Sequence, residues 1–188
     1  MPVSLPRRRN PFRDFIGDSP ITEIGASQAR LTGEALAANE SLAQYCYSSP
    51  SLRCIQTAHN ILQGNDGECA RVDMCRTINV GMGIEDRVKI RIEPGLFEFL
   101  GWYERGLPSF FNSSESTMND VDGAGMSEFN IDKTYRPIIS LEKLSRDEKY
   151  IDYYNRSFKV TQQITDKHKL TGKSTEKTHD EQSRSRLF

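Results

Sequence analysis

Apolar residues recur at intervals of three and four in three stretches of the chain, which is the spacing of helices that bury one face. The first helix is predicted to begin after the capping residue Thr22 and to end at Asn39. Its apolar face is expected to consist of Ala29, Leu31, Ala35, Leu36 and Ala38. The second helix, Ser51 to Gln63, is expected to end at Gly64, because glycine commonly follows the last helical turn.

The third helix is predicted from Asp147 to Thr165, and the polar segment that follows it has a different character. The apolar stripe of this helix is expected to consist of Ile151, Tyr154, Phe158, Thr161 and Ile164. Residues 166–188 contain few large apolar side chains and cannot bury enough surface to offset the entropy of ordering. We therefore predict a disordered polar tail over 166–188.

Two short segments are predicted strands. Tyr45 to Ser48 is aromatic and stops at a proline, and Val88 to Glu93 alternates strictly between apolar and charged residues. The order helix, strand, helix, strand, helix favours an α/β fold, a three-layer sandwich with a mostly parallel sheet. One domain over residues 1–165 is expected, with an extended arm over 1–20 and insertions near 64–87 and 112–130, where the sequence is polar and shows no clear period.

Charge and cysteine usage exclude several classes of function. The 25 Lys and Arg residues nearly balance the 26 Asp and Glu residues, so neither nucleic acid nor a membrane surface is an expected partner. No stretch approaches the roughly 20 apolar residues of a membrane-spanning helix. The four cysteines fit neither a disulfide scaffold nor a zinc site. These features predict a cytoplasmic protein with reduced thiols, no metal and no cofactor.

Arg53 and Glu98 are the candidate site residues. Arg53 lies in the first turn of a helix that follows a strand, where free N–H groups and a guanidinium suit a phosphate group. Glu98 follows the second strand, and its apolar neighbours would favour the protonated form of a general acid. Parallel strands would bring both residues to one edge of the sheet. From spacing alone, Arg53 is about equally consistent with an ordinary exposed helix residue, and Glu98 taken alone reads as a solvated surface charge.

The histidines are weaker candidates. His59 lies near the buried face of the second helix, where a packed or solvated role is more common than ligation. His168 and His179 fall in the predicted disordered tail, which offers no scaffold that would hold a catalytic group in place.

Three segments carry a family resemblance: Pro20 to Ala29, Ser49 to Ala58 and Glu93 to Glu98. They resemble motifs of the histidine phosphatase superfamily, which has the phosphoglycerate-mutase-like fold. The similarity is greatest to the family of the suppressors of T-cell-receptor signalling and ecdysteroid-phosphate phosphatase. The resemblance implies hydrolysis of a phosphate monoester, a phosphotyrosine protein or a steroid phosphate, through a phosphohistidine. It implies that Arg53 is a phosphate-pocket arginine and that Glu98 is the acid near the leaving group.

The sequence departs from the family pattern at the catalytic histidines. It contains no Arg-His-Gly motif, and no apolar strand ending in Ala-His follows Thr165. The resemblance therefore leads us to expect a histidine phosphatase domain truncated at both ends and inactive as given, whose full-length parent could form a homodimer. The alternative is a non-catalytic module that binds phosphate or another protein.

Overall fold

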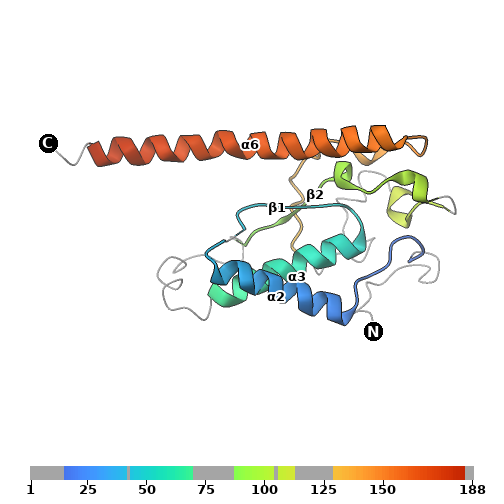
Figure 1. Cartoon of the computed structure of the whole chain (residues 1–188), viewed down its shortest axis with the longest axis horizontal. Coiled ribbons are helices and arrows are strands. Elements are labelled where there is room, and N and C mark those ends of the chain that lie inside the picture. Colours follow the sequence, from blue (N-terminus) through green and yellow to red (C-terminus); the bar gives the residue numbers. More distant parts are fainter. Residues whose placement is uncertain (1–14, 42, 70–86, 104–105, 113–128, 185–188) are drawn as a thin grey trace.

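The computed structural model describes residues 15–41, 43–69, 87–103, 106–112 and 129–184, which form three layers. A small sheet lies between α6 on one side and the pair α2 and α3 on the other (Figure 1). The helices span Glu23–Ala38 (α2), Leu52–Cys69 (α3) and Tyr150–Arg184 (α6). Short 3-10 helices cover Pro94–Leu96 (η2), Leu100–Trp102 (η3), Ser109–Asn112 (η4) and Leu141–Lys143 (η6). The predicted α/β architecture is confirmed.

The sheet pairs two parallel strands, β1 (Cys46–Ser48) and β2 (Ile90–Ile92). Both lie within the segments predicted as strands, and Cys46 pairs with Ile90. A single bridge adds Ile131 beside Ile90, and Phe129 is buried in the core below the sheet. The end of the predicted 112–130 insertion therefore belongs to the core, because Phe129 is buried among Leu52, Ile55 and Ile90; residues 113–128 lie outside the described residues.

The core below the sheet comes mainly from α3. Leu52, Ile55 and Leu62 pack with Ile90 and Phe129, so the predicted apolar face of this helix is confirmed. The helix does not stop at Gly64 but continues to Cys69, and the predicted 64–87 insertion is therefore helical over its first residues. The rest of that insertion, 70–86, lies outside the described residues.

Gly64 lies where α3 crosses α2 closely and does not mark the end of α3. A Cβ atom added to Gly64 would lie 2.0 Å from the carbonyl oxygen of Arg30 on α2, and one added to Gly33 would lie 2.0 Å from the carbonyl oxygen of Ile61 on α3. The two backbones meet at a distance that no side chain tolerates. Tertiary contact therefore overrides the local signal for a helix end at Gly64.

The same crossing decides which face of α2 is buried. Thr22 caps the helix as predicted, its hydroxyl accepting a hydrogen bond from the Gly25 N–H at 3.1 Å. The buried residues are Ala29 and Gly33, whereas Leu31 is 55% exposed. The prediction that Leu31, Ala35, Leu36 and Ala38 form the buried face was wrong, because only small residues fit against the α3 backbone.

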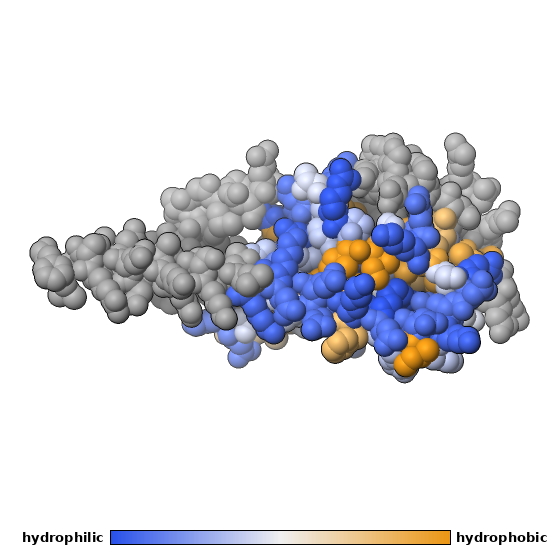
Figure 2. Space-filling model, turned by 90° about the horizontal axis from the view of Figure 1, so that it is seen from above, coloured by the Kyte–Doolittle hydropathy of each residue, from blue (hydrophilic) through white to orange (hydrophobic). Residues whose placement is uncertain are grey.

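α6 also turns its apolar stripe away from the rest of the chain. Ile151, Tyr154 and Phe158 are each more than 60% exposed, while Arg156 and Val160 are buried. Figure 2 looks at this side of the molecule and shows apolar surface in patches between hydrophilic ones. The predicted buried stripe was wrong, because the face that meets the rest of the chain is chosen by polar contacts of Arg156 that periodicity does not reveal.

The tail predicted to be disordered over 166–188 is described as far as Arg184, and α6 continues through that part of it; residues 185–188 lie outside the described residues. Composition alone could not show that the helix would find contacts on the sheet as far along as His168. Among the helices of the described residues, none is long and apolar enough to cross a membrane.

Candidate functional site

The turn after β1 places the start of α3 at the carboxyl edge of the sheet. Ser49, Pro50 and Ser51 are buried there, and the Leu52 N–H donates to the Asp18 carboxylate at 2.7 Å. Asp18 is fully buried, so this part of the predicted solvated arm over 1–20 is in fact core; residues 1–14 lie outside the described residues. The helix N-terminus that we expected to attract an anion already holds the chain's own carboxylate.

Arg53 and Glu98 meet at this edge. The Arg53 Nη2 donates to the Glu98 Oε1, and the two side chains are 32% and 29% exposed. The predicted juxtaposition of the two residues is confirmed, and neither is an isolated surface charge. Their catalytic roles stay a prediction.

Tyr103 completes the cluster and was missed from the sequence. Its hydroxyl donates to the same Glu98 Oε1 that Arg53 binds, and its ring lies beside Phe97 with the centroids 5.5 Å apart. Burial, followed by the hydrogen bond to Glu98, raises the pKa of Tyr103 to about 12. No spacing rule marks this residue, because η3 and the following turn bring it back toward Glu98.

The electrostatics of the cluster keep Arg53 charged. Burial alone would lower the pKa of Arg53, but hydrogen bonds to Tyr103 and Glu98 and the charge of Glu98 outweigh it and raise the pKa above its ordinary value. The guanidinium is thus a permanent cation held by a carboxylate. An anion that approaches Arg53 has to compete with Glu98 for it.

A buried carboxylate anchors the turn that carries Glu98. Glu93 is fully buried at the end of β2 and accepts hydrogen bonds from the N–H groups of Gly95 (3.0 Å), Ile138 (2.6 Å) and Ile139 (3.1 Å) and from the Tyr135 hydroxyl (2.7 Å). These bonds tie the turn after β2 to the segment before α6.

The apolar neighbours of Glu98 do not enclose its carboxylate. Phe97 is fully buried in a cluster with Leu100 and Phe110, and Phe99 stacks on Tyr150 with ring centroids 4.2 Å apart. The contacts of the carboxylate are instead the Arg53 guanidinium and the Tyr103 hydroxyl, and the role of Glu98 as a protonated general acid stays a prediction.

A cavity of about 650 Å³ lies beside Arg53. It is lined by β1, the turn after it and α3, including Cys54 and Thr57. Burial raises the pKa of the Cys54 thiol, although the charge of Arg53 opposes this. Among the described residues, no group of His, Cys, Asp and Glu side chains is arranged to hold a metal ion.

The two histidines whose side chains are described lie away from this cluster. His59 contacts Gln63 at 2.9 Å and the edge of Phe129. His168 stacks on Tyr45 with ring centroids 3.7 Å apart, and its Nε2 lies 3.0 Å from the Tyr47 hydroxyl. The prediction that no scaffold holds His168 was wrong, because α6 carries it across the sheet.

Comparison with known proteins gives a family match over more than half of the chain. Residues 13–123 match the family model of the histidine phosphatase superfamily (branch 1). The chain is 41% identical over 173 residues to mouse (Mus musculus) ubiquitin-associated and SH3 domain-containing protein B. It is 32% identical over 166 residues to the ecdysteroid-phosphate phosphatase of Drosophila melanogaster. These alignments cover 92% and 87% of this chain but only 23% and 19% of the relatives.

A solved structure supports the same assignment. The crystal structure of the ecdysone phosphate phosphatase from the silkworm, determined in complex with tungstate, superposes with a TM-score of 0.64 at 27% sequence identity. The superposition covers 92% of this chain and 56% of that one. The chain thus spans about half of this structural neighbour and less than a quarter of the mouse and fly relatives.

Proposed function

Because the chain belongs to the histidine phosphatase superfamily (branch 1), we propose that Arg53 binds the phosphoryl group of a phosphate monoester and that Glu98 lies beside the leaving oxygen. The observation that carries this proposal is the Arg53–Glu98 contact at the carboxyl edge of two parallel strands. Ligands of open α/β sheets collect at that edge. The tungstate complex of the structural neighbour supports the choice of an oxyanion.

Arg53 and Glu98 have different proposed roles because the first is a cation and the second is an acid. The Arg53 guanidinium offers planar paired donors that match two phosphoryl oxygens. A carboxyl group at the position of Glu98 can give a proton to the leaving oxygen, which is general acid catalysis. The Glu98 carboxylate accepts a hydrogen bond from the Arg53 guanidinium, so a phosphoryl group binds Arg53 by displacing Glu98.

We propose in addition that the 188-residue chain binds the phosphoryl group without turning it over. A phosphohistidine mechanism needs an imidazole in line with the phosphorus atom. His59 contacts Gln63 and Phe129, and His168 contacts Tyr45 and Tyr47, so neither is engaged with Arg53; the side chain of His179 lies outside the described residues. A phosphotyrosine protein and a steroid phosphate are the two candidate phosphate monoesters for this site.

Titration of the chain with tungstate, followed by calorimetry, tests the binding. We expect Arg53→Ala to abolish binding, while Arg30→Ala, which removes an exposed arginine paired with Glu34, leaves it unchanged. Equal binding by the wild type and Arg53→Ala would contradict the proposed site. Hydrolysis of p-nitrophenyl phosphate that disappears in Arg53→Ala would show that the chain turns over, against the second part of the proposal.

A further inference from the structure

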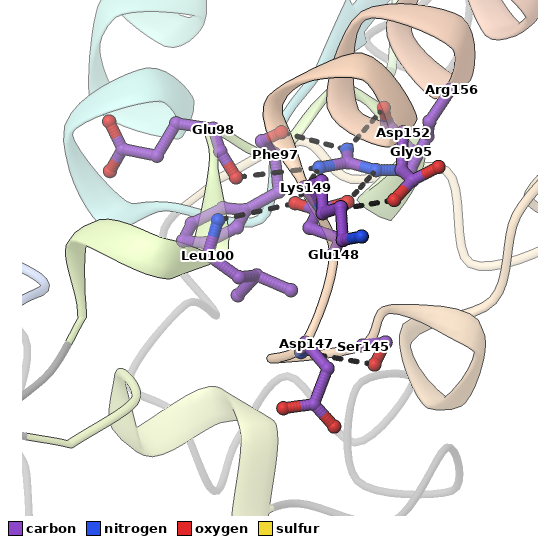
Figure 3. A network of polar contacts seen from close by, with 10 residues as sticks. All are labelled: Gly95, Phe97, Glu98, Leu100, Ser145, Asp147, Glu148, Lys149, Asp152 and Arg156. Atoms are coloured by element: carbon purple, nitrogen blue, oxygen red, sulfur yellow. Dashed lines mark hydrogen bonds and ion pairs between the residues drawn. The ribbon is translucent and has the colours of Figure 1, made fainter.

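A buried ion pair on the opposite side of the Glu98 turn points to a role for α6 in the site. Arg156 projects from α6 toward this turn, and its side chain is only 8% exposed (Figure 3). Its Nε and Nη2 bind the two carboxylate oxygens of Glu148 at 3.1 and 2.7 Å. Glu148 is 7% exposed, so the guanidinium and the carboxylate neutralise each other away from water.

The same guanidinium binds three backbone carbonyls of the turn, those of Gly95, Phe97 and Glu98. Its Nη1 donates to the carbonyl oxygens of Gly95 at 2.9 Å and of Phe97 at 2.8 Å, and its Nη2 reaches the carbonyl of Glu98 at 3.5 Å. Glu148 accepts the Leu100 N–H at 3.2 Å, two residues past Glu98. The ion pair thus hydrogen-bonds to the backbone of the turn both before and after Glu98.

These contacts use the full donor set of an arginine. A guanidinium has five N–H groups in one plane, and Arg156 directs them to Glu148 and to the three carbonyls. Gly95 brings the turn close to α6, since a Cβ atom there would lie 2.5 Å from Val160. A lysine has three donors that are not coplanar and cannot reproduce this set.

The backbone carbonyl and the side chain of Glu98 point in different directions. The Glu98 carbonyl faces Arg156, while the Glu98 carboxylate points away from it (Figure 3) and pairs with Arg53 of α3. We propose that Arg156, held by Glu148, is a positioning residue that aims the Glu98 carboxylate at Arg53. The inference rests on the proposed function, because it makes α6 set the geometry of the phosphoryl site without touching the ligand.

Anion binding separates this role from a merely structural one by the sign of the effect. Glu98 competes with the anion for Arg53, so Glu98→Gln is expected to tighten tungstate binding about tenfold. If Arg156 aims Glu98, Arg156→Lys also tightens binding, and Glu98→Gln adds little more in the Arg156→Lys background. A general loosening of the site would weaken binding instead and would overturn the proposal.

A readout without ligand keeps this test independent of the proposed function. The charges of Arg53 and Glu98 both act on the pKa of the Cys54 thiol, the first lowering it and the second raising it. The rate at which Cys54 is alkylated is measured at each pH by mass spectrometry of the peptide that contains it. The midpoint of this profile is expected to fall in Glu98→Gln and in Arg156→Lys, by about half a unit or more, but not further in the double variant. A wild-type midpoint in Arg156→Lys, with a lowered midpoint in Glu98→Gln, would overturn the inference even if tungstate binds.

Two further variants test whether the effect is specific to the Arg156–Glu148 pair. Glu148→Gln loosens the guanidinium while keeping the size of its partner, and it is expected to shift the Cys54 midpoint in the same direction as Arg156→Lys by a smaller amount. Arg91→Lys is the matched control, because Arg91 lies on β2 and its side-chain hydrogen bonds within the described residues go to Asp132 at 3.1 Å and to the Tyr47 hydroxyl rather than to the turn. A shift in Arg91→Lys equal to that in Arg156→Lys would contradict a specific role for Arg156.

Discussion

The pair α2 and α3 lies below the sheet and α6 lies above it (Figure 1). The helices α2 and α3 cross so closely that backbone meets backbone, whereas α6 makes directed polar contacts with the turn after β2 and with Tyr47. The lower layer depends on small residues and on an apolar core around Leu52 and Ile55. The upper layer depends on Arg156, which grips the turn after β2, and on His168, which meets Tyr45 and Tyr47. Stability in the lower layer is therefore a matter of volume, and in the upper layer a matter of directed hydrogen bonds and charge.

The largest effect is expected from volume added to the lower layer. Gly64→Ala places a methyl group 2.0 Å from the Arg30 carbonyl oxygen, so one helix must shift, at a cost of about 1–3 kcal/mol in the free energy of unfolding. Urea denaturation measures it.

Gly25→Ala is the matched control for this substitution, because its Cβ would make only ordinary contacts, the nearest at 3.4 Å from the Thr22 hydroxyl. Helix propensity favours alanine by up to about 1 kcal/mol, so Gly25→Ala should be neutral or stabilising. Stabilisation by Gly64→Ala would refute the close crossing.

A smaller effect is expected from protonation in the upper layer. Burial, then the charges of Arg91 and Lys167, lower the pKa of His168 below its ordinary value of 6.5. The folded chain therefore binds this proton less readily than the unfolded chain, and stability decreases as the pH falls through and below about 6.5. Unfolding free energies between pH 8 and pH 5 measure the loss.

The control for this prediction keeps a hydrogen-bond partner for Tyr47 but removes the titratable imidazole of His168. His168→Gln offers an amide oxygen to the Tyr47 hydroxyl and carries no charge at any pH. Its stability should fall less than that of the wild type over the same range. Parallel pH profiles for the two chains would show that His168 does not couple α6 to the sheet.

The smallest effect is expected on the exposed stripe of α6. Phe158 is 70% exposed, so Phe158→Ser should change the free energy of unfolding by no more than about 0.5 kcal/mol. Val160 is fully buried on the opposite face, and Val160→Ala should cost about 1–2 kcal/mol in urea denaturation. A larger loss for Phe158→Ser than for Val160→Ala would mean that the stripe, rather than the Arg156 face, packs against protein.

The candidate site divides in a similar way between what a pattern indicates and what packing adds. Arg53 and Glu98 were identified because each follows a strand, and the parallel pairing of β1 and β2 brings them together. Tyr103 and Arg156 reach the same turn from an irregular segment and from a helix far along the chain. Neither position has a periodic signal, so neither was predicted.

The sequence alone determined the helices and strands with strong local signals, namely the Thr22 cap, the alternation before Glu93 and the apolar face of α3. The tertiary structure decided which faces of α2 and α6 are buried and where α3 and α6 end. The physical reason is that periodicity records where apolar side chains gather on a helix but not what lies opposite. At Gly64 the opposite surface is the backbone carbonyl of Arg30, and only a residue without a side chain lets α2 and α3 approach so closely. At Arg156 the opposite surface is the carbonyls of Gly95 and Phe97, and a buried guanidinium satisfies them.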